Sequence, residues 1–394
     1  MYARERYGII MAGVMLLMTG CSADDAVMET MTAPEEAVAI SFCCNYDDNE
    51  TPITKAGHLG EMNDEDLHTT GFGAMASVTA DKKPTLMYNQ EVAFTLVGDL
   101  DDPKKGYWSY APKKYWPTDL TDCYISAYAP YMSPADLAAL AGLPEEDLEK
   151  ETGIYGISAN NEAPYIDYRR CEKPGKQVDL LWYYEKPSAI PAATALNEAG
   201  TLAMKMRHAL ARLDIKVALA AEPASGTKVL VEEITLTGNM AKTGRLSLCS
   251  QTTEGSGVDK KYYPVWTNQV FDKNIGGDDI DHTFQIKNAD NDPESYGIIE
   301  SQVRYIPNLP YGWQPAGLST TPQDALNTGD RKGYVYLIPQ NELTLTITVK
   351  YKKWVEGEAE PTSGAKTTTV TPTSIANPLK GNKTYTLNLT LSGI

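Results

Sequence analysis

The chain has 394 residues and a formal net charge of −17 at neutral pH, from 52 acidic and 35 basic side chains. A negative charge of this size repels nucleic acids and anionic lipid headgroups, which argues against a nucleic-acid-binding protein. A chain of this length is larger than most domains with a single hydrophobic core, and we therefore expect two domains.

The first twenty residues have the pattern of a secretory signal peptide. Arg4 and Arg6 precede an uncharged run from Ile9 to Met18. As a helix, such a run spans about 15 Å, half of a bilayer core, which disfavours a permanent transmembrane helix. The sequence "MTGC" that ends at Cys21 resembles the lipobox of bacterial lipoproteins, in which the cysteine carries the lipid. We expect residues 1–20 to be a lipoprotein signal peptide and Cys21 to anchor the chain to the outer membrane.

Residues 21–36 are acidic and aperiodic, which predicts a tether. The following stretch, "AVAISFCC", reads as a strand. Its alternation places Val38, Ile40 and Phe42 on one side, and Cys43 and Cys44 on opposite faces.

The segment "SPADLAALAGLPEEDLEKETG" is the clearest helix candidate. Ser133 is a good N-cap, Pro134 suits the first turn, and three leucines supply apolar contacts before Pro144 interrupts the pattern. These leucines are Leu137, Leu140 and Leu143. Most of the remaining sequence indicates strands and turns.

Two later segments alternate strictly between apolar and polar residues, as half-buried antiparallel strands do. In "ELTLTITVKY" the apolar set is Leu343, Leu345, Ile347, Val349 and Tyr351. In "TYTLNLTLSGI" it is Tyr385, Leu387, Leu389 and Leu391.

The segment "LAMKMRHALARLDIKVALA" changes phase in its middle, because its apolar residues fall on even positions up to Leu210 and on odd positions from Ala211. A one-residue slip would turn the apolar set of a strand to the wrong face. We therefore expect a β-bulge or a sharp bend near Leu210 and Ala211. A helical turn through Met206, Leu210 and Leu213 is the alternative.

A domain boundary fits the proline- and alanine-rich stretch "EKPSAIPAATALNEAG". It divides an N-terminal domain, residues 37–195, from a C-terminal domain, residues 196–394. No short fixed repeat appears in the sequence, which argues against solenoids and propellers.

The sequence carries no familiar catalytic or metal-binding motif. The four histidines lack paired zinc spacing, and His208 falls on an apolar face, where a hydrogen-bonded core imidazole is the simpler interpretation. After Cys21, five cysteines remain without CxxC spacing, which favours small core side chains over a disulfide framework. Two acidic stretches invite a calcium interpretation: in "NADNDPESYG", Ser295 and Ser301 occupy the positions of the glycine and the glutamate of a calcium loop, and "GGDDIDHTF" equally fits a solvated turn. These stretches contain Asp278, Asp279, Asp281, Asp290, Asp292 and Glu294.

Tryptophans are the remaining candidates for a ligand site. They could stack on sugar rings, although in a β-rich protein such rings more often fill the core. The residues considered are Trp108, Trp116, Trp182, Trp266 and Trp313. Paired carboxylates of a glycosidase cannot be recognised from one sequence, because the partners meet only in the fold. We expect no enzyme activity, no cofactor and no metal site.

Nine stretches, in order along nearly the whole chain, resemble the fimbrillin-like family of Bacteroidetes, the subunits and accessory proteins of type V pili. They are "ISFCCNYDDNETPITKAG", "TGFGAMAS", "LMYNQEV", "WSYAPKKYWP", "YISAYAPY", "PYIDY", "VDLLWYY", "MRHALARLDIKV" and "YLIPQNELTLTITVKY". The resemblance implies two tandem β-sandwich domains of transthyretin-like topology, export as a lipoprotein, and no catalysis.

The resemblance also implies a mode of assembly. In polymerising members, a trypsin-like protease at the cell surface removes the first strand together with the lipid, and a strand from another subunit fills the groove. Lys55 and Ala56 lie where the family is cut, although members usually have arginine there. Val38, Ile40 and Phe42 then belong to the candidate displaced strand. The alternative is an exposed loop lysine that is never cut.

The sequence stops soon after its last predicted strand, whereas major stalk subunits of the family carry a longer donor tail. We therefore expect an adhesive tip or accessory subunit at the cell surface. Its expected partners are other pilin subunits, the processing protease, the outer membrane and a surface ligand. The alternative functions are a non-polymerising surface lipoprotein that binds glycan or protein ligands, and a pilus anchor that keeps its lipid.

Overall fold

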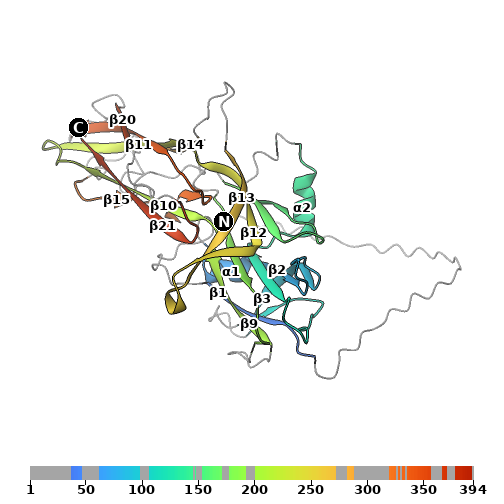
Figure 1. The fold of residues 1–394 in the computed structure, drawn as a ribbon. Helices are drawn as coiled ribbons and strands as arrows, with labels where there is room; N and C mark the ends of the chain where they lie inside the picture. Colours follow the sequence, from blue (N-terminus) through green and yellow to red (C-terminus); the bar gives the residue numbers. More distant parts are fainter. Residues whose placement is uncertain are drawn as a thin grey trace, which may run out of the picture. The chain divides into compact units, whose positions relative to one another are not determined.

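The computed structural model describes residues 37–46, 62–97, 106–144, 147, 153–170, 177–191, 200–271, 282–287, 319–324, 327–328, 331–332, 335–355, 366–370 and 378–392. From Val38 onward, these residues belong to one compact unit. Strands in several sheets dominate the unit (Figure 1). The prediction of a mostly β chain is therefore confirmed.

The first sheet has seven strands in the order β1-β9-β8-β5-β2-β3-β4. They are β1 (Ser41–Tyr46), β2 (Phe72–Ser77), β3 (Met87–Leu96), β4 (Gly106–Ser109), β5 (Tyr124–Ala129), β8 (Leu181–Glu185) and β9 (Thr201–His208). All neighbouring pairs are antiparallel except β1 and β9, which run parallel. The sheet thus begins with a strand whose partner starts 160 positions later, at Thr201.

The two faces of this sheet enter different hydrophobic clusters, because side chains alternate along each strand. One face contributes Phe42, Phe72 and Ile125 to a cluster that includes the apolar side chains of β1. The other face contributes Tyr128 and Trp182 to a second cluster. We call the cluster that holds Phe42 the β1 core.

A second sheet packs against the face opposite the β1 core. Its order is β13-β12-β7-β6, with β6 (Gly153–Ile157), β7 (Tyr165–Arg169), β12 (Ala241–Glu254) and β13 (Lys261–Phe271). A short 3-10 helix, η2 (Gly257–Asp259), lies between β12 and β13. Ile166 and Leu246 of this sheet share a cluster with Trp182 of the first. Strands from both halves of the sequence therefore build one core.

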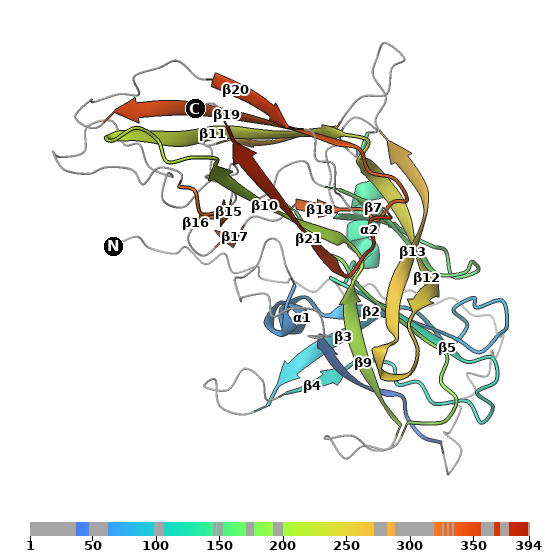
Figure 2. The same cartoon turned by 60° about the vertical axis from the view of Figure 1, so that its left-hand side comes forward.

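The C-terminal strands form two further four-stranded sheets. In one, β10 (Ala211–Leu219) contacts β15 (Gln323–Asp324), β18 (Val335–Leu337) and β21 (Lys383–Leu391). In the other, the order is β14 (His282–Lys287), β11 (Thr227–Gly238), β19 (Leu345–Val355) and β20 (Lys366–Val370). β16 (Asn327–Thr328) pairs with β17 (Arg331–Lys332). Figure 2 shows β21 alongside β10, with which it pairs in parallel over its whole length.

The two alternating segments form strands with the predicted faces. All the apolar residues expected to point inward are buried in one cluster with Leu213, Ile215 and Val217 of β10. Between them, Thr386, Asn388 and Thr390 are exposed. Both segments are half-buried strands as predicted, and β19 is antiparallel to its neighbours β11 and β20. The antiparallel pairing predicted for the last segment is wrong, because β21 pairs in parallel with β10; alternation reports the buried face of a strand and not the direction of its partner.

The phase break in the middle of the chain is a sharp bend. β9 ends at His208 and β10 begins at Ala211. At the bend, the backbone N–H of Ala209 donates to the carbonyl oxygen of Leu180 at 2.7 Å, and Leu210 accepts from Asn382 at 3.0 Å. The predicted bend is confirmed, and the helical alternative is wrong.

Two α-helices lie in the part of the chain that the structure describes, and the sequence predicted only α2 (Pro134–Ala141). The hydroxyl of Ser133 accepts the backbone N–H of Asp136 at 3.1 Å, as expected for an N-cap. The missed helix, α1 (Asp64–Thr70), is only seven residues long. Its signal was the capping box in which Asn63 and Asp66 accept each other's backbone N–H groups. The described residues include no helix long and apolar enough to cross a membrane.

Cysteines and tryptophans within the described residues mostly fill the core. Cys44 and Cys123 are buried, Cys43 is half-buried on the opposite face from Cys44, and the described cysteines are free thiols. Trp108, Trp116 and Trp182 are buried, and Trp266 packs against a buried cluster. The division into two domains near residue 195, and the transthyretin-like topology of each, stay predictions.

Candidate functional site

The first described strand, β1, lies at one end of the seven-stranded sheet and is the centre of the candidate site. It pairs in parallel with β9, from Ser41 opposite Thr201 to Tyr46 opposite Met206. Parallel neighbours must be joined by a long connection, and here everything from β2 to β8 intervenes. Within the seven-stranded sheet, β1 therefore pairs with β9 only, and its removal would break no pair between the other strands.

One face of β1 is embedded in the β1 core. Ile40, Phe42 and Cys44 are at most 2% exposed, and Val38 packs at the margin of the same cluster. The Phe42 ring meets Phe72 edge-on, with centroids 5.6 Å apart, and lies 5.6 Å from the ring of Tyr110. Alternate apolar side chains therefore fill a groove that the rest of the sheet forms.

The side of β1 away from β9 contacts a second segment, residues 108–116. Near its start, the backbone N–H of Ile40 donates to Lys114 at 2.8 Å, and that of Trp116 donates to Val38 at 2.9 Å. Two further backbone groups on this side accept hydrogen bonds from side chains. The Tyr110 hydroxyl donates to the carbonyl oxygen of Ile40 at 2.8 Å. Trp108 reaches the carbonyl oxygen of Cys44 at 3.3 Å. β1 is consequently held from both sides.

Two titratable groups of this groove, Cys44 and Tyr110, are uncharged at neutral pH. Burial raises the pKa of the Cys44 thiol well above its ordinary value, and nearby Asp64 and Cys43 raise it further. Burial likewise raises the pKa of Tyr110 to about 12. Both groups are therefore neutral, and the groove suits an apolar strand.

The backbone of Gly200 packs directly against the residues that precede β1. Its backbone has φ +82°, and a Cβ there would lie 2.5 Å from Cγ1 of Val38 and 2.6 Å from the carbonyl oxygen of Ala39. Its own carbonyl oxygen accepts the indole N–H of Trp116 at 2.7 Å. Only glycine combines this conformation with so close an approach.

We expect Gly200→Ala to lower the free energy of unfolding by more than about 1 kcal/mol. Alanine is strained at the positive φ, and its Cβ would also clash with Val38 and Ala39. Gly257→Ala is the matched control: its φ is +61°, but a Cβ there would meet nothing within 4 Å. Denaturant unfolding of both variants measures the difference. Equal losses of unfolding free energy in the two variants would mean that the first strand segment does not pack closely against residue 200.

His208 and His68 both have surroundings typical of structural histidines. His208 is buried, and its Nδ1 lies 2.5 Å from Oδ2 of Asp179. The same oxygen accepts the backbone N–H of Met62 at 3.1 Å. His68 stacks on Phe94 with centroids 3.6 Å apart, and burial lowers its pKa. Within the described ranges, no group of three or more His, Cys, Asp or Glu side chains could hold a metal ion.

The predicted site residues divide into two groups. Phe42 of β1 and Ile40 just before it belong to the β1 core, and Val38 packs against the same cluster, as their alternation predicted. Cys21, Lys55 and Ala56 lie outside the described residues, as do the acidic stretches around residues 278–294 and Trp313. The sequence did not indicate that Gly200, Tyr110 and Trp116 contact the first strand, because one glycine and aromatic residues without periodicity give no such signal.

The chain matches one family model over most of its length and is similar to solved structures. A model of the family described as fimbrillin-like matches residues 62–394. A fimbrial protein from Bacteroides vulgatus is similar in structure, with 17% identity, coverage of 90% of this chain and 95% of that chain, and a TM-score of 0.49. A fimbrial protein from Bacteroides ovatus has 10% identity, coverage of 90% and 50%, and a TM-score of 0.30. No curated protein matches the chain in sequence.

Proposed function

Because the chain belongs to the fimbrillin-like family, we propose that it is a structural and adhesive subunit of a cell-surface type V pilus. Within the pilus it acts as a tip or accessory subunit, which receives a strand from a neighbouring subunit. Its role is assembly and adhesion, without catalysis.

The observation that carries this proposal is the way β1 occupies its groove. Phe42 of β1 and Ile40, which directly precedes it, are buried, and the segment is hydrogen-bonded on both sides. Burying two such side chains contributes roughly 3–6 kcal/mol. A strand that replaced β1 would regain this contribution and the backbone bonds, which is the energetic basis of strand addition.

Processing links this groove to the N-terminal segment. A cut after Lys55 by a trypsin-like protease separates β1 and the lipid on Cys21 from the body of the protein. The edge of β9 and the pocket left by Phe42 then face solvent, and an uncovered apolar edge favours pairing with another chain. Before the cut, the lipid holds the subunit at the outer membrane.

A second candidate function is supported by the double attachment of β1. Hydrogen bonds from Tyr110 and Trp116, added to the pairing with β9, favour a chain that keeps its first strand. Such a chain is a lipid-anchored surface protein, either a pilus anchor or a non-polymerising protein that binds glycan or protein ligands.

Peptide mass spectrometry of surface fibres sheared from cells distinguishes the two functions. The assembling subunit is expected in the fibres, with its N-terminus at Ala56 and without lipid. A Lys55→Ala chain is the control and is expected to remain in the membrane fraction. Recovery of the unaltered chain only in membranes, with the lipid still on Cys21, would contradict assembly and support the anchored alternative.

A further inference from the structure

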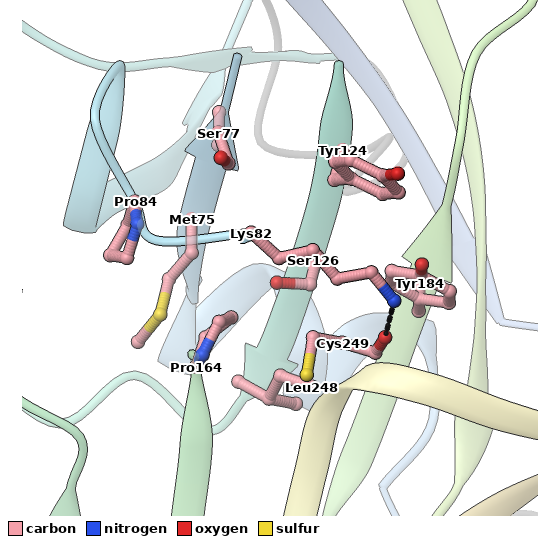
Figure 3. A pocket seen from close by; sticks show the side chains of 11 residues that line it. Met75, Ser77, Lys82, Pro84, Tyr124, Ser126, Pro164, Tyr184, Leu248 and Cys249 are labelled. Atoms are coloured by element: carbon pink, nitrogen blue, oxygen red, sulfur yellow. Dashed lines mark hydrogen bonds between the residues drawn. The ribbon is translucent and has the colours of Figure 1, made fainter. Parts of the chain in front are cut away.

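A hollow between the first sheet and β12 is occupied by a side chain of the protein itself. Lys82 extends across it, and its ammonium group donates to the carbonyl oxygen of Cys249 at 2.8 Å (Figure 3). The same nitrogen lies 5.1 Å from the ring centroid of Tyr124 and 5.4 Å from that of Tyr184. A ligand would have to displace these contacts, so the groove that holds β1 is the stronger candidate for a specific partner.

The edge of β9 that pairs with β1 continues toward the bend before β10. In a strand, the backbone groups of every second residue face the same neighbour. Gly200 faces β1, because its carbonyl oxygen accepts the N–H of Ser41 at 3.4 Å. Ala209 faces the opposite neighbour, since its N–H donates to Leu180, the residue before β8, at 2.7 Å. The backbone groups of the even-numbered residues from Gly200 to His208 therefore point to the β1 side.

Asn382 closes this edge at its downstream end. Its Oδ1 accepts the N–H of His208 at 3.2 Å, and its own N–H donates to the carbonyl oxygen of Leu210 at 3.0 Å. The last residue of β9 that pairs with β1 is Met206, and β21 pairs with β10 from Ala211 onward. β1 and β21 thus follow one another along the same edge, both parallel to it, with Asn382 between them.

The turn that leads into β21 holds Asn382 in this place. Its φ is +54°, a left-handed conformation that asparagine tolerates better than most residues. Gly381 comes so close to the bend that a Cβ there would lie 2.5 Å from the carbonyl oxygen of Ala209. The N–H of Lys380 donates to the hydroxyl of Tyr385 at 2.8 Å. These contacts fix the residue that closes the edge.

The upstream end of the same edge is closed as well. The N–H of Gly200 donates to the carbonyl oxygen of Pro191 at 3.0 Å, so this group is already used. Between the two ends, the edge offers the carbonyl oxygen of Gly200 and the backbone groups of Leu202, Met204 and Met206. The edge therefore accommodates the six residue pairs that β1 makes with β9.

We propose that Asn382 is a positioning residue for the strand that replaces β1. It confines that strand to the positions opposite residues 201–206 and keeps it from sliding farther along the edge. The register matters, because a slip of two residues would carry the donor's side chain away from the pocket of Phe42. This inference rests on the proposed strand exchange, to which it adds the length and the register of the donor strand.

Competition between two peptides tests the proposal. Full-length protein is cut at a protease recognition sequence inserted after Lys55, and labelled peptide is added in excess to replace the β1 fragment. One peptide has residues 37–46, and the other is lengthened at its C-terminus by threonine and valine. Both are expected to bind the otherwise unchanged chain within about twofold of each other, because Asn382 already occupies the N–H of His208. In Asn382→Gly the longer peptide is expected to bind at least about threefold more tightly, since it gains that N–H.

Asn268→Gly is the matched control, because Asn268 also has a positive φ, +50°, but is exposed on β13. Glycine tolerates the positive φ at both positions. The two peptides are expected to bind this variant equally. Hydrogen exchange in the uncut chain gives a second readout. The amide of His208 is expected to exchange at least about tenfold faster in Asn382→Gly, whereas that of Ala209, bonded to Leu180, keeps its rate.

Tighter binding of the longer peptide to the otherwise unchanged chain would show that the groove extends past Met206. No gain for the longer peptide in Asn382→Gly, or an unchanged exchange rate of His208, would show that Asn382 does not close the edge. In both cases strand exchange itself would stand, because the peptides still replace β1. If neither peptide replaces β1 in any variant, the proposed strand exchange is wrong, and this inference is wrong with it.

Discussion

Replacing Phe42 by alanine lowers the free energy of unfolding by about 3–5 kcal/mol, the usual cost of removing a fully buried aromatic ring. The ring is 1% exposed and contacts Phe72 and Tyr110 on neighbouring elements. The loss reflects both the lost burial and the cavity that remains between those rings. Guanidinium unfolding, followed by tryptophan fluorescence, to which Trp108 in the same cluster contributes, measures it.

Phe271→Ala is the matched control for this prediction. Phe271 ends β13 and is 37% exposed, so its loss is expected to change the free energy of unfolding by less than about 0.5 kcal/mol. If Phe42→Ala were as mild as the control, β1 would contribute little to the core. Burial of side chains in the groove would then contribute little free energy to the binding of another strand.

A chain that begins at Ala56 is expected to bind a synthetic peptide of residues 37–46. The peptide restores the hydrogen bonds that Trp116 and Tyr110 make with β1 and refills the pocket of Phe42. A Phe42→Asp peptide is expected to bind at least about 100-fold more weakly, because the apolar groove would have to bury a carboxylate. Fluorescence anisotropy of a labelled peptide, under reducing conditions, measures both affinities.

The control peptide carries Cys43→Ser, a small change on the half-buried opposite face of β1. It is expected to bind within about threefold of the native peptide, which corresponds to less than 1 kcal/mol. Equal affinity of the Phe42→Asp and native peptides would show that main-chain pairing alone holds the strand. In that case the groove would not select donors by their side chains.

Local patterns made several elements predictable. Strict alternation identified the buried faces of β19 and β21, because one side of each strand meets a core and the other meets solvent. The change of phase located the bend between β9 and β10, since each strand turns its apolar face to a different cluster. A serine followed by a proline identified the start of α2.

Long-range pairing was not predictable from such patterns. Nothing near residues 41–46 indicates a parallel partner 160 positions later, because pairing of distant strands leaves no periodic signal. The role of Gly200 likewise depends on the approach of Val38, which only the fold creates. α1 was missed because seven residues without an apolar stripe give little helical periodicity.

The size of the protein after limited trypsin cleavage tests the exchange of the first strand most directly. Light scattering is measured behind a sizing column, before and after the cut, with Lys55→Ala as the uncut control. The expected result is cleavage after Lys55, release of the fragment that contains β1, and oligomers that form only from the cut chain. A cut chain that stays monomeric with its groove empty, or that retains β1 in place, would contradict assembly by strand exchange.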